Sequence, residues 1–366
     1  MIPVIFAINQ AYTRQLRVAL LSLYRHAKEA TQYQVYVLHY DVTIDSQELI
    51  CAEQEKLHTR GALEFVRLSD EQYTKIPLVG RWGKETNFRL LLPELIPKGD
   101  KVIYLDTDVL VLADLADLFR TQLDDCWLAA AMEERAGYRN YTIASFMAQA
   151  EAQELTFVPQ RSPYINAGVL VLNVALMREK DITPRALHLL ARLPAHWFEN
   201  SRYDFFLMPD QDILYYLAYQ SSKGVRHLPD RYNHIVGYYY YKDMPKFASQ
   251  EAYAHWLGYI DSLAGKHASQ TWEDYQPAII HYADSAPWSK RRGLVPYEAL
   301  YRAYAKEIGW KLPNKWLINL ITWAKRRFFY RKTTRDAWGR KGMALLALNM
   351  LMVGLVLMIM TIWLVF

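Results

Sequence analysis

The chain has 366 residues, of which 52% are hydrophobic and 22% charged, so it can bury a large core and is too apolar to be intrinsically disordered. Its two cysteines, Cys51 and Cys126, lack the spacing of metal ligands and exclude a disulfide-based scaffold. The net charge of +5 comes from residues 314–366, which carry nine basic residues and one acid. Residues 1–313 carry 34 basic and 37 acidic residues. This slightly acidic composition does not support nucleic-acid binding.

Strands and helices alternate along the first part of the chain. Apolar runs predict strands at residues 4–8, 33–40, 62–68 and 101–112, and helical spacing predicts helices at 13–27, 46–57 and 84–96. The first run has no basic residues before it and is too short for a signal peptide. This alternation predicts an α/β fold with a parallel, Rossmann-like sheet covered by helices on both faces. Ligands of such sheets bind at the carboxyl ends of the strands.

The second part of the chain continues the pattern without a linker or an internal repeat. Strands are predicted at residues 127–133 and 164–173 and within 278–288, and a helix begins near residue 210. Residues 237–275 are rich in tyrosine and tryptophan, which is typical of a saccharide-binding surface or of ordinary core packing. Residues 1–310 are therefore predicted to form one catalytic domain.

The C-terminal part is predicted to contact a membrane. Residues 314–341 combine basic side chains with apolar and aromatic positions at helical spacing, as in a helix that lies in the interface and binds anionic lipids. A helix that packs on the protein body is the alternative. Residues 343–366 contain no charged residue, which predicts a transmembrane helix rather than a buried core helix. The basic cluster before it predicts a single-pass anchor in the inner membrane, with the catalytic domain in the cytoplasm.

Two acids interrupt the apolar strand predicted at residues 101–112. Asp106 and Asp108 flank Thr107 in the sequence VIYLDTDVLVL, at the point where the apolar run VIYL ends. Alternate residues of a strand share a face, so both carboxylates could approach one cation such as Mg²⁺ or Mn²⁺. By itself the pair favours a turn, in which aspartates cap the backbone.

Further polar residues stand at the ends of other predicted elements. His281 follows a strand, Asp210 and Gln211 begin a helix, and Asn166 precedes a strand. Each has an ordinary structural explanation, such as a helix N-cap for Asp210. No glycine-rich phosphate loop is present, which argues against a nucleotidyl or phosphoryl transferase.

Taken in order, these motifs resemble a family 8 retaining glycosyltransferase, the group that contains bacterial lipopolysaccharide galactosyl- and glucosyltransferases and glycogenin. The resemblance covers residues 3–288 and rests on VIFAINQAY, NFRLLLPELI, VIYLDTDVLV, YINAGVLVLN, PDQDIL and HYADSAPW. It implies a nucleotide-diphospho-sugar transferase fold of the GT-A type. It also implies a UDP-sugar donor, Mn²⁺ (or Mg²⁺) as cofactor and retention of the anomeric configuration.

The resemblance assigns roles to individual residues. It makes Asp106, Asp108 and His281 the metal ligands, and it places Gln211 and Asp210 at the catalytic centre. The remaining residues that it assigns to the donor are Ala7, Asn9, Tyr12, Arg89, Asp106, Glu133, Asn166 and Trp288. Because an amide is a poor nucleophile, Gln211 favours same-face transfer through an oxocarbenium-like state over a covalent intermediate.

The sequence departs from the family pattern in two places. Asn9 stands where the family often has an acid, and the loop HYADSAPW lacks the usual phosphate-contacting lysine. Lys290, Arg291 or Arg292 is a candidate replacement for that lysine.

The sequence thus predicts a metal-dependent hexosyltransferase. It is expected to move galactose or glucose from UDP-galactose or UDP-glucose to a saccharide or glycolipid acceptor at the membrane, in cell-envelope glycan or lipopolysaccharide synthesis. The alternative is a membrane-tethered sugar-nucleotide or glycan-binding protein without turnover.

Overall fold

The computed structural model of the chain describes residues 1–57, 61–78, 83–96, 99–133, 139–154, 164–193, 208–221, 223–236, 277–283, 286–289, 295 and 297–315. The aromatic region 237–275, the predicted span 343–366 and all but two residues of the basic segment 314–341 lie outside these ranges. Internal contacts divide the chain into one unit of Met1–Pro287 and Pro296–Leu312 and another of Trp288–Val295 and Pro313–Phe366. The predicted domain limits at residues 310, 314 and 343 stay a prediction.

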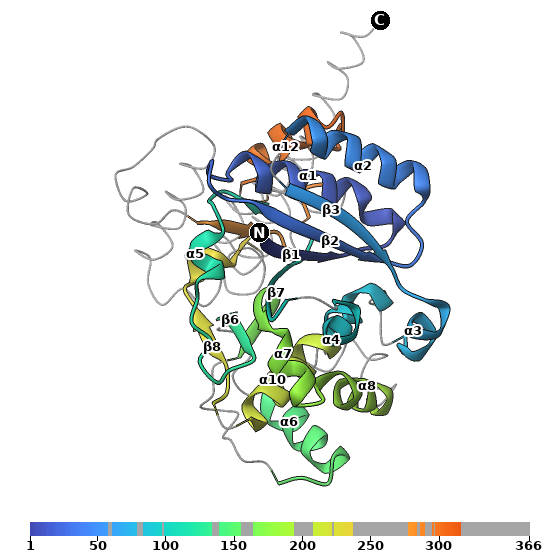
Figure 1. The fold of residues 1–366 in the computed structure, drawn as a ribbon, viewed down its shortest axis with the longest axis vertical. Coiled ribbons are helices and arrows are strands. Elements are labelled where there is room, and N and C mark those ends of the chain that lie inside the picture. The colour runs from blue at the N-terminus through green and yellow to red at the C-terminus, as the bar shows by residue number, and fades with distance from the viewer. Residues whose placement is uncertain are drawn as a thin grey trace, which may run out of the picture. The chain divides into compact units, whose positions relative to one another are not determined.

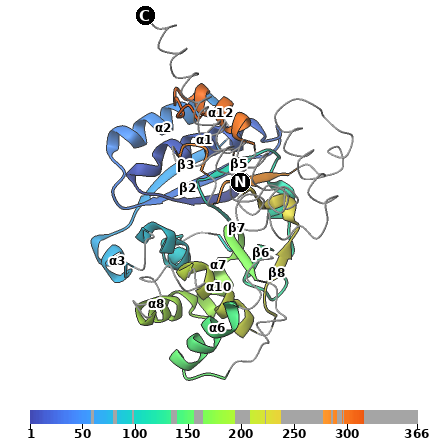
Figure 2. The same cartoon turned by 180° about the vertical axis from the view of Figure 1, so that it is seen from behind.

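The first unit is built around a seven-stranded sheet with the order β3-β2-β1-β4-β7-β6-β8 (Figures 1 and 2). The strands of this sheet are β1 (Ile2–Ala7), β2 (Tyr33–His39), β3 (Gly61–Arg67), β4 (Lys101–Leu105), β6 (Leu128–Met132), β7 (Ile165–Asn173) and β8 (Arg226–Leu228). Strands β1 to β4 are parallel, as the alternating pattern predicts, whereas β7 runs antiparallel to both β4 and β6. A second sheet has the order β5-β10-β9, formed by β5 (Val109–Val111), β9 (His234–Ile235) and β10 (Ile279–His281).

Helices lie on both sides of the large sheet, as Figures 1 and 2 show. The α-helices are α1 (Thr13–Arg25), α2 (Ile44–Leu57), α3 (Asp70–Lys75), α4 (Leu92–Leu95), α5 (Ala116–Phe119), α6 (Arg139–Ala150), α7 (Val174–Glu179), α8 (Ile182–Arg192), α10 (Pro209–Gln220) and α12 (Glu298–Glu307). Three 3₁₀ helices complete the described elements: η1 (Gln10–Tyr12), η2 (Lys84–Leu91) and η4 (Asp230–Tyr232). Helices α1 and α2 lie on one side, and α4, α7, α8 and α10 lie on the other.

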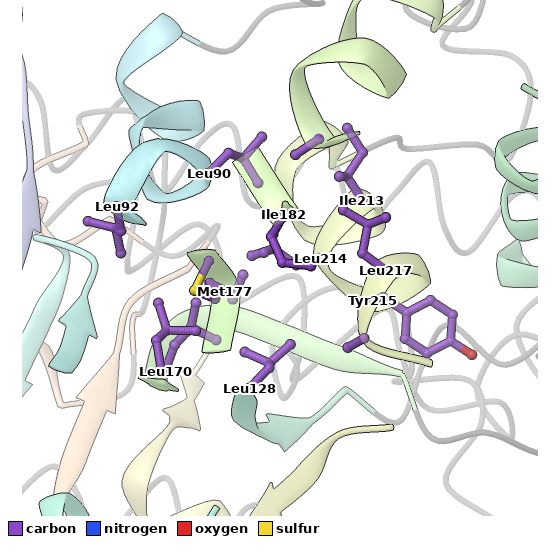
Figure 3. Packing of buried hydrophobic residues seen from close by; sticks show 14 of the residues in the cluster. Leu90, Leu92, Leu128, Leu170, Met177, Ile182, Ile213, Leu214, Tyr215 and Leu217 are labelled. Atoms are coloured by element: carbon purple, nitrogen blue, oxygen red, sulfur yellow. The ribbon is translucent and has the colours of Figure 1, made fainter. Parts of the chain in front are cut away.

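Side chains that alternate along each strand form two cores. In β4, Val102 and Tyr104 belong to one core, whereas Ile103 and Leu105 belong to the other. The first core packs against η2, α7, α8 and α10, where Leu90, Met177 and Leu214 meet (Figure 3). Because both faces of β4 and β7 are buried, these strands are almost continuously apolar, and a polar residue in them stands out from the pattern.

The helix predicted at residues 84–96 is divided in the structure. Residues 84–91 form the 3₁₀ helix η2, and the short α4 begins at Leu92 with Pro93 in its first turn. Proline has no N–H to donate and its ring clashes with the carbonyl four residues earlier, here that of Arg89, so a continuous α-helix is excluded. Arg89 consequently lies near the end of η2.

The strand predicted at residues 101–112 is also divided. Strand β4 ends at Leu105 and β5 begins at Val109 in the other sheet, so residues 106–108 form the connection between the two sheets. The turn interpretation of the acidic pair is therefore right about the backbone. It does not exclude a metal site, because the same turn projects both carboxylates toward one point.

The predicted location at the inner membrane requires a correction. No helix in the part of the chain that the structure describes is long and apolar enough to cross a membrane. An apolar composition forms a span only where it folds into one continuous helix of about 20 residues, and the structure supplies no such helix in its described ranges. The segment 343–366, on which the prediction of an anchor rested, lies outside them.

Candidate active site

Strand pairing brings the two acids and His281 together. In the small sheet β10 runs antiparallel to β5, with His281 opposite Val109, the residue after Asp108. The N–H of Tyr282 donates to the Asp108 carbonyl at 2.8 Å and extends this pairing. In the large sheet the Asp106 N–H donates to the Gly168 carbonyl of β7 at 2.8 Å. The large sheet thus fixes one end of the connection between β4 and β5, and the small sheet fixes the other.

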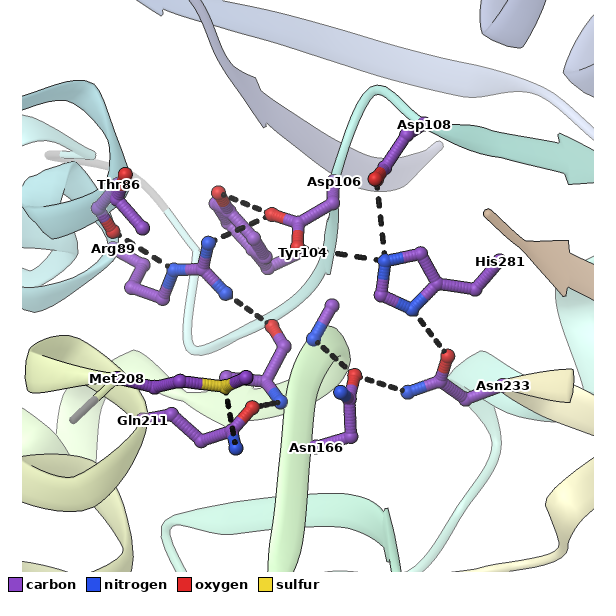
Figure 4. A network of polar contacts seen from close by, with 12 residues as sticks. Thr86, Arg89, Tyr104, Asp106, Asp108, Asn166, Met208, Gln211, Asn233 and His281 are labelled. Carbon is purple, nitrogen blue, oxygen red and sulfur yellow. Dashed lines mark hydrogen bonds and ion pairs between the residues drawn. The ribbon is translucent and has the colours of Figure 1, made fainter. Parts of the chain in front are cut away.

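Asp106, Asp108 and His281 form a cluster with the composition of a metal site. One ligand atom of each lies within 4.8 Å of the others. The His281 Nε2 atom is 3.2 Å from Asp108 Oδ1 and 3.9 Å from Asp106 Oδ2 (Figure 4). Carboxylate oxygens with one imidazole nitrogen suit a divalent ion such as Mn²⁺ or Mg²⁺. The donor set therefore fits the metal that the sequence predicts, without identifying the ion.

Gly168 makes room for the His281 ring. A Cβ atom added at Gly168 would lie 2.1 Å from His281 Cε1 and 2.7 Å from Nδ1, which is closer than any real contact. The imidazole therefore packs directly on the backbone of β7. A glycine in the interior of a buried strand often marks such a close approach.

Arg89 balances the charge of two carboxylates. Its Nη2 atom donates to Asp106 Oδ1 at 2.7 Å, and its Nε atom lies 3.0 Å from Asp210 Oδ2. Its guanidinium carbon lies 4.5 Å from the centre of the Tyr104 ring, and the Tyr104 hydroxyl donates to Asp106 at 3.1 Å. Asp210 stands in the first turn of α10, where the helix dipole also favours a negative charge.

Three polar side chains extend the network away from the metal cluster. Gln211 donates from Nε2 to Glu133 Oε2 at 3.1 Å, and its Oε1 accepts the Ala167 N–H at 2.8 Å. Asn166 donates to the same Glu133 oxygen at 3.4 Å. Glu133, Asn166, Asp210 and Gln211 all have exposed fractions of 9% or less. Each buried amide and carboxylate is satisfied, which fixes the orientation of this surface.

Burial and neighbouring charges shift the pKa values of the site. Burial alone would lower the pKa of His281. The carboxylates of Asp108 and Asp106 together have a larger effect than burial and raise this pKa. Burial would raise the pKa of Asp108, but His281 draws it below the usual value. Burial raises the pKa of Asp210, against the opposing effect of Arg89. Carboxyl and imidazole groups with shifted pKa values gathered at one place are typical of functional sites.

In the structure, the residues predicted for the donor and the catalytic centre lie in two groups. Arg89, Asp106, Glu133, Asn166, Asp210 and Gln211 belong to the network around the metal cluster. Ala7 is the last residue of β1, and Asn9 and Tyr12 follow it in the chain. Asn9 donates to Glu85 at 3.3 Å, and the acids at 106 and 108 contribute to a raised pKa of Tyr12 after burial itself. Trp288 belongs to the second unit, and its role in donor binding stays a prediction.

The sequence pattern does not indicate several residues of the network. Asn233 accepts from His281 Nδ1 at 2.9 Å, and it follows η4 in a stretch without a regular pattern. Tyr164 donates its hydroxyl to Asp212, and Tyr104 reads as one more apolar position of a buried strand. The only signals for them were polar groups in otherwise buried segments, and those do not reveal partners far away in the chain.

Comparisons with known proteins agree with this geometry. The sequence model of Glycosyl transferase family 8 matches residues 3–291. General stress protein A of Bacillus subtilis is 23% identical over 312 residues, which cover 84% of this chain and 94% of that protein. Glycosyltransferase GlyE of Streptococcus pneumoniae is 34% identical over 134 residues, 35% of this chain and 30% of that protein.

Solved structures share the fold. An active-site mutant of LgtC has a TM-score of 0.59 at 24% identity and covers 86% of this chain and 99% of its own. The galactosyltransferase LgtC in complex with donor and acceptor sugar analogs has a TM-score of 0.57 at 23% identity, over 87% of this chain and 100% of its own. These likenesses confirm a GT-A-like α/β fold, and the match of the family model over most of the chain shows that the protein belongs to glycosyl transferase family 8.

Proposed function

We propose that this glycosyltransferase is a retaining, metal-dependent enzyme that transfers galactose or glucose from a UDP-sugar to a saccharide acceptor, free or lipid-linked. The observation that carries the proposal is the continuity of the site. A three-residue cluster suited to a divalent metal shares Asp106 with a buried arginine, and that arginine reaches the first turn of α10. A sugar nucleotide has a diphosphate beside its sugar. Its binding site therefore needs a cation for the diphosphate next to hydrogen-bonding side chains for the sugar.

In this proposal the two parts of the site hold the two parts of the donor. Asp106, Asp108 and His281 hold the metal ion, which supplies charge stabilisation for a departing UDP. Glu133, Asn166 and Asp210 face the sugar, and their carboxylate and amide groups accept and donate hydrogen bonds to hydroxyls. Ala7, Asn9 and Tyr12, at the end of β1, are proposed to contact the uridine.

The surroundings of Gln211 favour same-face transfer. Its amide is held at both ends, by the Ala167 N–H and by Glu133, so its carbonyl oxygen has a fixed position. An amide oxygen can stabilise a positively charged, oxocarbenium-like sugar but is a poor nucleophile. A covalent sugar trapped on Asp210 or Asp212 and detected by mass spectrometry would contradict this mechanism.

A donor panel tests the proposed function. The protein is incubated with Mn²⁺ and UDP-glucose, UDP-galactose or their N-acetyl forms, with and without saccharide acceptors, and UDP release is measured. We expect Mn²⁺-dependent release with one hexose donor and an α-linked product by NMR. The Asp108→Asn variant should lose this activity, whereas Asp117→Asn, which alters an exposed acid paired with Arg120, should keep it. Binding of donor without any UDP release would favour a non-enzymatic sugar-nucleotide-binding protein.

A further inference from the structure

A continuous chain of hydrogen bonds runs from His281 to Gln211. His281 Nδ1 lies 2.9 Å from Asn233 Oδ1, and Asn233 Nδ2 lies 2.8 Å from Asn166 Oδ1. Asn166 then donates to Glu133, which also accepts from Gln211. Figure 4 shows Asn233 between His281 and Asn166. The chain joins the metal cluster to the amide proposed to face the reacting sugar.

The backbone of β7 fixes the direction of every bond in this chain. The Gly168 N–H can only donate, and it lies 2.9 Å from the Asn166 atom that also faces Asn233. That atom must therefore be the Asn166 carbonyl oxygen, and the Asn233 atom that faces it must be the amide nitrogen. The carbonyl oxygen of Asn233 is left to face His281.

The consequence falls on the tautomer of His281. An acceptor at 2.9 Å from Nδ1 requires a proton on Nδ1, so Nε2 is the atom that can offer its lone pair to a metal. This is also the atom that faces Asp106 and Asp108. Asn233 has an exposed fraction of 4% and Asn166 one of 5%, so water has little access to replace either partner.

We propose that Asn233 is a positioning residue that sets the metal-binding tautomer of His281 through its carbonyl and ties the metal cluster to the sugar-facing side chains through its amide. Partners that orient a ligating histidine generally change metal affinity or activity about 10- to 100-fold when removed. The inference rests on the proposed function, because the tautomer of His281 matters to catalysis only if this cluster holds the metal of the donor complex.

Two substitutions separate the two ends of Asn233. Asn233→Leu has a similar size and removes both hydrogen bonds, whereas Asn233→Asp keeps an acceptor for His281 Nδ1 and loses the donor to Asn166. Mn²⁺ affinity is measured by the electron paramagnetic resonance signal of free Mn²⁺, in the presence of UDP and without any sugar donor. UDP release from the active donor gives kcat and KM separately. Gln54→Leu, which removes a buried amide bonded to the Gly61 carbonyl of β3, is the matched control for lost stability.

We expect Asn233→Leu to weaken Mn²⁺ binding about 10- to 100-fold. Asn233→Asp should bind Mn²⁺ about as tightly as the wild type but have a lower kcat, because the orientation of Asn166 is lost. Gln54→Leu should lower the melting temperature and leave Mn²⁺ affinity unchanged.

Wild-type Mn²⁺ affinity in Asn233→Leu would overturn the inference, and so would an equal loss of affinity in Asn233→Asp. If Asn233→Leu does not fold, Asn233→Asp decides alone, since loss of its Mn²⁺ affinity contradicts the role of the carbonyl. If the wild type binds no Mn²⁺ with UDP, the proposed function fails as well. If the wild type binds Mn²⁺ and both Asn233 variants bind it equally well, the role of Asn233 is contradicted but the proposed function is not.

Discussion

Arg89 is a buried guanidinium between two carboxylates, and its exposed fraction is 3%. Burial by itself would lower the pKa of Arg89, but Asp106 and Asp210 outweigh this effect and raise it. The arginine is therefore charged at every relevant pH. It pairs with two acids, Asp106 and Asp210, and balances their charge.

Replacing Arg89 by methionine should be severely destabilising. The substitution leaves Asp106 and Asp210 without their counter-charge, and breaking a buried ion pair in this way costs roughly 3–5 kcal/mol. The free energy of unfolding in urea measures the effect. Arg120→Met, which breaks an exposed pair with Asp117, should cost about 1 kcal/mol or less. Equal effects of the two substitutions would contradict this description of Arg89.

Asp212 predicts a specific pH dependence of stability. Burial raises its pKa to about 7, although the hydrogen bond from Tyr164 and that from the Met208 N–H act in the opposite direction. An unfolded aspartate titrates near pH 3.9, so between about pH 4 and pH 7 the folded protein binds a proton that the unfolded chain does not. This contribution to stability is complete below about pH 4 and is lost as pH rises through 7.

The Asp212→Asn variant removes this contribution while every other group stays the same. Relative to the wild type, its free energy of unfolding should therefore rise as the pH increases from 5 to 7.5. Denaturant titrations of both proteins at several pH values measure the difference. A difference that does not change with pH would show that Asp212 is already ionised in the folded protein.

At the scale of elements, β7 is the part of the sheet on which the site is built. It pairs with β4 along one edge and presents Asn166, Ala167 and Gly168 next to the connection between β4 and β5. The Ala167 carbonyl accepts from Arg89, and the Ala167 N–H holds Gln211. The antiparallel direction of β7 thus brings its N-terminal end to the carboxyl end of β4.

Gly168→Ala should separate metal binding from folding. The added methyl group would occupy the space of the His281 ring, so the ring must leave its present position beside Asp106 and Asp108. We expect a large loss of Mn²⁺ affinity with a circular dichroism spectrum like that of the wild type. Val171→Ala, in the same strand and in the second core, should lower the melting temperature but keep Mn²⁺ affinity. Unchanged Mn²⁺ binding in Gly168→Ala would contradict the position of His281.

At the scale of the whole molecule, the residues that could be predicted are those whose chemistry stands out against an apolar pattern. Asp106 and Asp108 interrupt a buried strand, and the end of β4 at Leu105 is where the sequence indicates it. The parallel half of the sheet follows from the alternation of strands and helices. The antiparallel β7 does not, because a nine-residue apolar strand has the same appearance in either direction.

Contacts between residues that are distant in the chain could not be predicted from the sequence pattern. Asn233 follows a 3₁₀ helix, and only the pairing of β9 with β10 brings it beside His281. The family resemblance supplied the roles proposed for the site residues, but not the hydrogen bonds that orient them. The C-terminal membrane location is another prediction that needed correction, since it rested on composition and no helix in the described part of the chain is long and apolar enough to cross a membrane.

Ligand-induced stabilisation tests the assembled site. A ligand that binds only the folded protein stabilises it by about 2.7 kcal/mol at 100 times its Kd. Mn²⁺ and UDP together should therefore raise the melting temperature by more than the sum of their separate effects, since each completes the site of the other. Asp108→Asn should abolish this cooperative increase, and Asp117→Asn should retain it. Additive effects of the two ligands in the wild type would mean that they bind independently.

The most direct test of the central claim is anomalous diffraction at the manganese edge, from crystals of the wild-type protein grown with Mn²⁺ and UDP. We predict one strong anomalous peak bounded by the carboxylates of Asp106 and Asp108 and by His281 Nε2, with the diphosphate next to it. A peak at another position, or none at this cluster while UDP is bound, would contradict the assignment of the metal site.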